Sequence, residues 1–272
     1  MKPKCIRHME PWRHRPFILS GYRPAGKSAS LYLRNLFSIH NESFDIWSHG
    51  VMCLVMLRRL ANRLNWEHYN EYPVFDVWMT VAFTFVFAAS TIAHLWHVMS
   101  EATHVSLFRL DWSMIGLSSN IAAVCFIGAA SGKRDTSDFE MAKFGLVFSF
   151  LVCCFHNHRM YYTMNKRFKT VLIALPSVLL VSFLLQQSDV SKEAKIKLLE
   201  LLRIPTCVAC FGLTCFLCYI PERFYPGKFD TFGHSHNIHH IWSSLISVLL
   251  IRVLMIIQDD NFSRLRDKNM FF

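Results

Sequence analysis

PERFYPGKFDTFGHSHNIHHI, residues 221–241, leads into the last long apolar segment of the chain and carries His236 and His240. Residues four apart stack on one face of an α-helix, so both imidazoles can reach one point beside the helix. This is the spacing of metal ligands. A catalytic zinc ion takes three protein donors and keeps its fourth position for water, so we expect a third donor from elsewhere in the chain.

Candidates for that third donor lie near the end of another apolar segment, AFTFVFAASTIAHLWHVM, residues 82–99. Ser90 and His94 stand four apart there, and His97 lies on nearly the same helical face as His94. Asp111 opens the next apolar segment. A lone membrane histidine is more often a packed side chain, but ionisable groups that cluster inside a membrane usually face the protein interior and serve a function. We therefore predict one polar site, and spacing leaves open whether His94 or His97 belongs to it.

The composition is that of a membrane protein. Of the 272 residues, 53% are hydrophobic, and the mean hydropathy is +0.26, which is too apolar for an ordinary soluble domain. The formal net charge of +10 does not indicate nucleic acid, because that partner needs a soluble module with a basic, aromatic-rich face. Here the basic residues lie mostly between apolar segments, so we attribute them to the electrostatics of the lipid membrane surface.

The nine cysteines are odd in number and most lie inside apolar segments, so we do not expect a disulfide framework. Two CxxC pairs, at residues 207–210 and 215–218, invite comparison with a zinc ribbon. Such ribbons separate their pairs by about 15 to 20 residues and use soluble loops. We interpret these cysteines as small packing residues of a membrane span.

Three regions are predicted along the chain: a basic amino-terminal arm at 1–35, a membrane domain at 36–258 and a short carboxyl-terminal tail at 259–272. We expect an all-α membrane protein, a bundle of seven transmembrane helices joined by short connections. The first span starts near residue 36 and is short, because Arg58 and Arg59 interrupt it; their side chains are expected to snorkel to the far interface. The other predicted spans are 75–99, 110–130, 139–155, 170–186, 204–220 and 238–257.

Seven spans place the candidate site residues on one side of the membrane. The end of the second span, the start of the third and the start of the seventh share a side, whatever the orientation of the chain. His94, Asp111, His236 and His240 therefore lie at one membrane depth. Four scattered polar residues thus become one candidate site.

The orientation follows from the arm, which carries eight Lys and Arg residues before the first span. The positive-inside rule then predicts a cytosolic amino terminus and an exterior or lumenal carboxyl terminus, in the plasma membrane or an endomembrane. We expect the arm to lie near anionic headgroups with no fold of its own. The site would lie near the cytosolic face.

Four blocks of residues carry a resemblance to a known family. They are HNESFDIWSH at 40–49, the pair Ser90 and His94, LDWSMIG from Leu110, and PERFYPGKFDTFGHSHNIHH at 221–240. Over residues 36–258 the chain resembles the progestin and adipoQ receptor family, and most of all its membrane progestin receptor branch. The resemblance implies a seven-helix bundle with zinc bound by His94, His236 and His240, Asp111 holding a water at the metal, and Ser90 nearby.

The chain departs from the family at Asp45, where the family usually has Asn, so a carboxylate replaces an amide at that corner. The short first span also differs from the family. Among the other histidines, His234 and His239 do not share the face of the metal pair and are expected to be interfacial. His156 and His158 point about 200° apart on a helix, so joint ligation is not expected.

Three functions remain open at this point. The first is a membrane receptor with a zinc site, a steroid or lipid ligand and intracellular signalling partners. The second is an intramembrane zinc hydrolase of ceramide-like lipids, in which Asp111 takes the proton of the attacking water. The third is a membrane protein whose zinc only links two spans. An open site is favoured over a structural one, because no cysteine is placed to be a fourth donor.

Overall fold

The computed structural model of the chain describes residues 5–64, 74–131, 165–187 and 190–269, with residues 144, 147–148, 150–151 and 154–155 between them. Helices make up its architecture. The α-helices are α1 (Ala29–Arg34), α2 (Ser43–Arg63), α3 (Val74–Trp96), α4 (Glu101–Ser131), α7 (Lys166–Gln187), α8 (Lys192–Cys218) and α9 (Ser235–Asn269). Short 3-10 helices are η1 (Ile6–His8), η2 (Pro11–Arg13), η3 (Asn35–Phe37) and η5 (His97–Met99).

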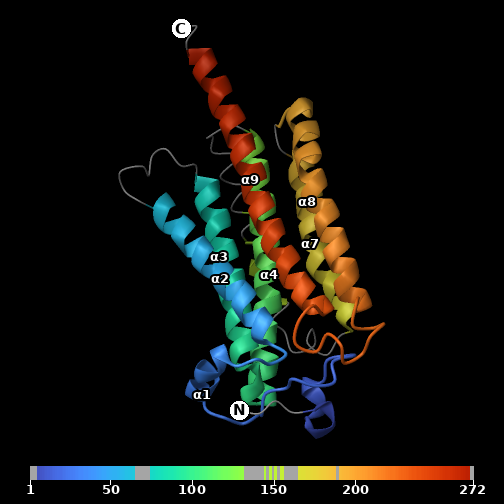
Figure 1. Cartoon of the computed structure of the whole chain (residues 1–272). Helices are drawn as coiled ribbons and strands as arrows, with labels where there is room; N and C mark the ends of the chain where they lie inside the picture. Colours follow the sequence, from blue (N-terminus) through green and yellow to red (C-terminus); the bar gives the residue numbers. More distant parts are fainter. Residues whose placement is uncertain are drawn as a thin grey trace.

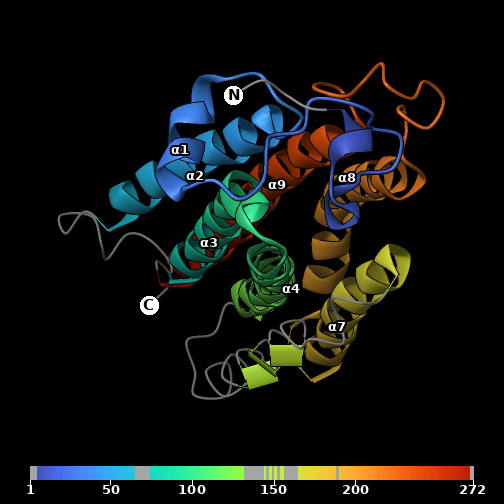
Figure 2. The same cartoon turned by 90° about the horizontal axis from the view of Figure 1, so that it is seen from below.

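The long helices form one bundle. In Figure 1, α2, α3, α4 and α9 run side by side; α8 packs along the other flank of α9, and α7 packs against α4. Figure 2, from below, shows α3 between α2 and α4, in agreement with the contacts of α3 with both neighbours. The amino-terminal segment covers one end of the bundle and the carboxyl terminus projects from the other. The start of α2 and the start of α9 therefore share the end that the arm covers.

Four of the described helices are long and apolar enough to cross a membrane: Val74–Met99, Glu101–Ala130, Lys192–Cys218 and Ser235–Asp259. They confirm the predicted second, third, sixth and seventh spans as long apolar helices. The predicted first and fifth spans are also helical, in α2 and α7, but do not meet the same criterion of length and composition. The predicted fourth span lies mostly outside the described residues.

The bundle is held together by close packing of apolar side chains. Met79 and Phe87 of α3, Cys125 of α4 and Leu254 of α9 are fully buried in one cluster. Gly128 of α4 lets the Phe75 ring approach so closely that an added Cβ would lie 2.3 Å from its Cζ. Small residues at such contacts are typical of helices that pack within lipid, where the hydrophobic effect no longer drives association.

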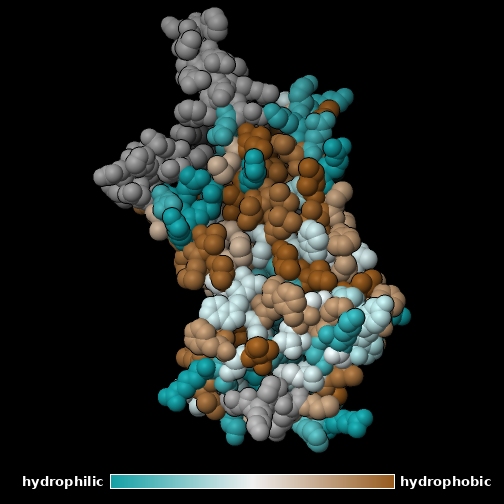
Figure 3. All heavy atoms as spheres, in the orientation of Figure 1, coloured by the Kyte–Doolittle hydropathy of each residue, from teal (hydrophilic) through white to brown (hydrophobic). Residues whose placement is uncertain are grey.

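The surface agrees with a membrane location. Figure 3 shows hydrophobic side chains gathered over the long helices and hydrophilic ones toward the ends of the molecule. Several large apolar side chains of α2 and α8 are exposed, among them Leu54, Ile204 and Phe211, each more than half accessible at 67%, 62% and 57%. Such exposure is expected where lipid, not water, surrounds the helices.

The arm is folded, so the expectation of an arm without a fold was wrong. Ile18, Tyr22 and Tyr32 are almost completely buried at 2%, 3% and 0% exposure. The Tyr32 hydroxyl donates to the Pro24 carbonyl at 2.8 Å, and the Asn41 amide donates to the Gly21 carbonyl at 2.9 Å. The arm is ordered because these contacts, and the arginine contacts described below, tie it to the end of the bundle. Composition alone shows only its charge.

Candidate metal centre

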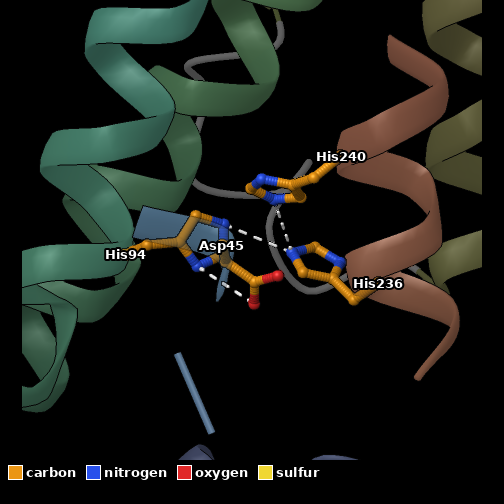
Figure 4. A group of neighbouring side chains, drawn as sticks. All are labelled: Asp45, His94, His236 and His240. Carbon is orange, nitrogen blue, oxygen red and sulfur yellow. Dashed lines mark hydrogen bonds and ion pairs between the residues drawn. The ribbon is translucent and has the colours of Figure 1, made fainter. Parts of the chain in front are cut away.

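The three histidines implied by the sequence meet between α3 and α9. His94 lies in the last turn of α3, and His236 and His240 are one turn apart at the start of α9. The Nε2 atoms of His94 and His236 are 3.2 Å apart, and those of His236 and His240 are 3.3 Å apart (Figure 4). The four-residue spacing of the α9 pair therefore does bring two imidazoles to one point.

These separations suit a zinc ion. With Zn–N bonds of about 2.0–2.1 Å and tetrahedral angles, two imidazole nitrogens on one ion lie about 3.3–3.4 Å apart. The opposite ring nitrogens make other contacts: His94 Nδ1 lies 2.7 Å from Glu42 Oε2, and His240 Nδ1 lies 3.1 Å from Ser48 Oγ. A ring that donates through Nδ1 keeps its lone pair on Nε2. Converging lone pairs repel one another unless a proton or a cation lies between them, so this donor set fits a divalent metal.

Glu42 supports His94 from behind. It directly precedes α2 and is buried at 2% exposure. Its Oε2 accepts from His94 Nδ1 and, at 2.8 Å, from the Nη2 of Arg15 in the arm. A carboxylate on the outer nitrogen of a metal-binding histidine fixes the tautomer and orientation of the ring and raises its basicity.

Asp45 is the fourth member of the group that could hold a metal ion, and its ligand atom lies within 4.8 Å of the histidine ligand atoms. Both of its oxygens are already engaged: Oδ1 accepts from Asn237 Nδ2 at 2.6 Å and Oδ2 accepts from Arg15 Nη1 at 3.0 Å. Oδ2 also lies 3.9 Å from His94 Nδ1, the outer nitrogen of that ring. We therefore interpret Asp45 as a residue that supports the histidines from outside and does not itself bind the metal. Its carboxylate is thus paired with a cation and with an amide.

The side chains of Ser90 and Asp111, the other two predicted site residues, lie next to each other. Both are buried, at 2% and 7% exposure. Ser90 Oγ also lies 2.8 Å from Nδ1 of His49 in α2, whose ring stacks on His240 with centroids 3.7 Å apart. Side chains from α2, α3, α4 and α9 thus form a continuous polar group around the three histidines.

Comparison with known proteins places the chain in a family. Residues 37–249 match the haemolysin-III related family model. The chain belongs to this family. It is the family of the progestin and adipoQ receptors, as the sequence motifs indicated. Together with the long apolar helices, this membership identifies an integral membrane protein.

Similar proteins are membrane progestin receptors. The human membrane progestin receptor alpha is 27% identical over 246 residues, which cover 86% of this chain and 70% of that protein. Its counterpart from Sus scrofa is 28% identical with the same coverage. The human membrane progestin receptor beta is 25% identical over 262 residues, which cover 89% of this chain and 72% of that protein.

The structure also shows which of the other histidines belong to the cluster. His97 turns away from the cluster, with Nε2 3.4 Å from Glu42 Oε1 and Nδ1 3.0 Å from His104 Nδ1. His94 is therefore the α3 residue that meets the α9 pair. His239 stacks on Phe216 at 4.5 Å, outside the cluster as expected.

His234 is not interfacial as predicted, because it is buried at 1% exposure. Its Nδ1 accepts from the backbone amide of Asn237 at 3.3 Å, which satisfies a donor in the first turn of α9. Helical spacing did not reveal this contact, since His234 precedes the helix. His156 and His158 lie outside the described residues.

Two acidic residues of the loop before α9 bind the start of that helix and the arm. Glu222 accepts from the amide of Ser235 at 2.7 Å and from its hydroxyl. Asp230 accepts from the Leu19 amide at 2.9 Å and from the Ser20 hydroxyl at 2.6 Å. The loop PERFYPGKFD therefore fixes both the helix that carries two of the clustered histidines and the arm beside it.

Two arginines of the arm bind the bundle beside the histidine cluster. Arg23 donates to the carbonyl oxygens of His94 and Leu95, at 2.6 and 2.9 Å, and so satisfies the end of α3. Burial lowers the pKa of Arg23 to about 10, so its guanidinium remains charged at neutral pH. Arg15 bridges Glu42 and Asp45. The sequence motifs did not indicate these two residues, because both contacts join segments far apart in the chain.

A cavity of about 350 Å³ opens beside His236, between the arm and the bundle. Its walls combine aromatic rings, among them Trp12, Trp112 and Phe216, with cationic groups such as Lys169. The cavity gives the three-histidine cluster an adjoining space with an apolar lining and polar groups at a few places, which is typical of ligand pockets.

Proposed function

We propose that this chain is a membrane receptor of the progestin and adipoQ receptor type, with zinc held by His94, His236 and His240 and a steroid or lipid as its ligand. The observation that carries the proposal is the convergence of three Nε2 atoms at the spacing of zinc ligands. The printed names of the relatives, which are membrane progestin receptors, support the receptor class and the steroid ligand.

The adjoining cavity supports a small apolar ligand. Its volume of about 350 Å³ lies within the usual range of pockets for drug-sized molecules, about 300–1,000 Å³. Aromatic walls would contact the ligand body, while Lys169 and His236 offer polar contacts at separate points of the lining. A ligand bound there would touch the arm and α9 together, and could thereby shift their arrangement and act on intracellular signalling proteins.

In this proposal the chain crosses the membrane seven times, with a cytosolic amino terminus and an exterior or lumenal carboxyl terminus. The common end of α2 and α9, with the metal cluster and the basic arm, faces the cytosol. The carboxyl terminus projects from the opposite end of the bundle, as this topology requires (Figure 1). The eight basic residues of the arm support a cytosolic position.

Metal analysis of the purified protein tests the proposal. We expect about one zinc per chain in the wild type and a sharp loss in His236→Ala, because removal of one of three ligands removes much of the coordination energy. His239→Ala is the matched control on the same helix, since its ring stacks on Phe216 instead of joining the cluster. Equal zinc loss in His239→Ala, or no zinc in the wild type, would overturn the assignment.

A second function, hydrolysis of ceramide-like lipid amides, is favoured by the buried position of Asp111 beside Ser90 and His94. Zinc, when bound, would supply a Lewis acid that polarises a carbonyl and makes water acidic near neutral pH. Asp111 would take a proton from that water and pass it to the leaving amine. Ser90 would orient the Asp111 carboxylate by donating its hydroxyl hydrogen to it. A third role, a zinc that only links α3 and α9, predicts no turnover and no dependence of signalling on Asp111.

A further inference from the structure

A basic cavity lies at the end of α2 opposite the metal centre. Its volume is about 370 Å³ and its lining consists of Val55, Arg58, Arg59, Asn62 and Arg63. The 21 residues of α2 span about 30 Å at 1.5 Å per residue, roughly the thickness of the hydrocarbon core of a bilayer. In a membrane, this cavity therefore lies at the level of the headgroups on the side away from the metal centre.

Only part of the positive charge in this cavity is neutralised. Asp76 of α3 is buried at 1% exposure and pairs with Arg59 Nη2 at 2.7 Å and with Arg63 Nε at 2.6 Å. Arg58 is exposed and has no carboxylate partner in the part of the chain that the structure describes. Arg58 therefore adds to the cavity a positive charge that no carboxylate of the described residues pairs with.

The same side of α2 offers apolar surface next to the arginines. Val51, Leu54 and Val55 are exposed at 51%, 67% and 47%. Arg58 follows them at helical spacings of seven, four and three residues, so these side chains continue one stripe along the helix. A molecule lying on this stripe would meet an apolar surface first and then a cluster of guanidinium groups at the membrane interface.

We propose that this cavity binds the phosphate of an anionic phospholipid. Arg58, Arg59 and Asn62 act as the donors, and the acyl chains lie along Val51 and Leu54. Guanidinium groups donate paired hydrogen bonds to phosphate oxygens, and the pairing of Arg59 with Asp76 fixes one of these groups in advance. The unbalanced charge favours an anionic headgroup over a zwitterionic one, which would bring its own cation into a basic site.

Binding of dioctanoyl phosphatidylglycerol to the purified full-length protein, in a neutral maltoside detergent, tests this proposal by calorimetric titration. We expect saturable binding at one site, weakened at least fivefold in Arg58→Gln. Arg34→Gln, at the end of α1, removes the same charge from a different exposed surface and is expected to bind the lipid normally. Asn62→Ala keeps the charge, loses one donor and is expected to weaken binding less than Arg58→Gln does.

Arg58→Gln leaves the pairing of Asp76 with its two arginines intact, so the variant is expected to fold and to keep the zinc content of the wild type. Dioctanoyl phosphatidylcholine and inorganic phosphate complete the series as competing ligands. The proposal is overturned if either of them binds as tightly as the anionic lipid, if no lipid binds, or if Arg34→Gln and Arg58→Gln weaken binding equally.

Discussion

Arg15 donates from Nη1 to Asp45 Oδ2 at 3.0 Å, although the two residues lie 30 positions apart. The second branch of the same guanidinium, Nη2, donates to Glu42 at 2.8 Å. The two carboxylates are buried side by side at the start of α2, and Arg15 is the cation shared between them. The carboxylate at position 45 is therefore accompanied by a cation from the arm.

This relationship predicts that Arg15→Gln destabilises the fold, whereas Asp45→Asn in the same chain restores part of the loss. Removing one partner of a buried ion pair costs about 3–5 kcal/mol, because the remaining charge stays buried. Asp45→Asn alone is expected to be mild, since the amide oxygen can still accept from Asn237. Thermal unfolding in detergent of the four proteins of this double-mutant cycle measures the coupling. Simple additivity of the two changes would show that Arg15 does not act through Asp45.

Glu42→Gln is predicted to lower zinc affinity about 10- to 100-fold without removing a ligand, as loss of an outer hydrogen-bond partner typically does. The amide can still accept from His94 Nδ1, but without the negative charge that makes the ring more basic. Competition with a fluorescent zinc chelator measures the affinity. The control is Ser30→Ala, because Ser30 lies in the arm away from the cluster. An unchanged affinity in Glu42→Gln would mean that the carboxylate only packs against the ring.

The proposed topology predicts that a tag on the amino terminus is reached by antibody only after the membrane is permeabilised. A tag after Phe272 is expected to be reached from the exterior or lumenal side. The charge of the arm is the physical reason, because basic segments before a first span are retained in the cytosol. If both ends prove to lie on one side, α2 does not cross the membrane and the count of seven spans is wrong.

Asp111→Asn is predicted to keep zinc and to abolish any hydrolysis of lipid amides. The amide has nearly the same shape as the carboxylate and can hydrogen-bond water, but it cannot take a proton from it. Ligand binding is expected to change little, because the cavity lining supplies most of the contact area. Release of fatty acid from a ceramide by zinc-loaded protein measures the activity. If the zinc-loaded wild type shows no turnover and the variant signals normally, the receptor has no enzymatic step.

Much of the fold followed from local pattern. Apolar segments of sufficient length predicted the long helices, and four of them meet the criterion for crossing a membrane. The spacing of His236 and His240 predicted their convergence, because helical geometry alone places residues four apart on one face. The prediction that His94 lies at their depth rested on the alternation of spans, and the structure brings it to them.

The tertiary structure decided the rest of the site. Helical spacing does not distinguish His94 from His97. The structure does, because α3 ends between them, where Arg23 binds the His94 carbonyl, and η5 turns His97 toward Glu42. His49, the last residue of HNESFDIWSH, contacts Ser90 and stacks on His240, and the sequence did not predict either contact. Pairings between segments far apart depend on how the helices pack, because periodicity states which face a residue occupies but not what it meets. That is why the sequence determined the helices and the ligand spacing, while the packed bundle determined which histidine joins the cluster and which charges support it.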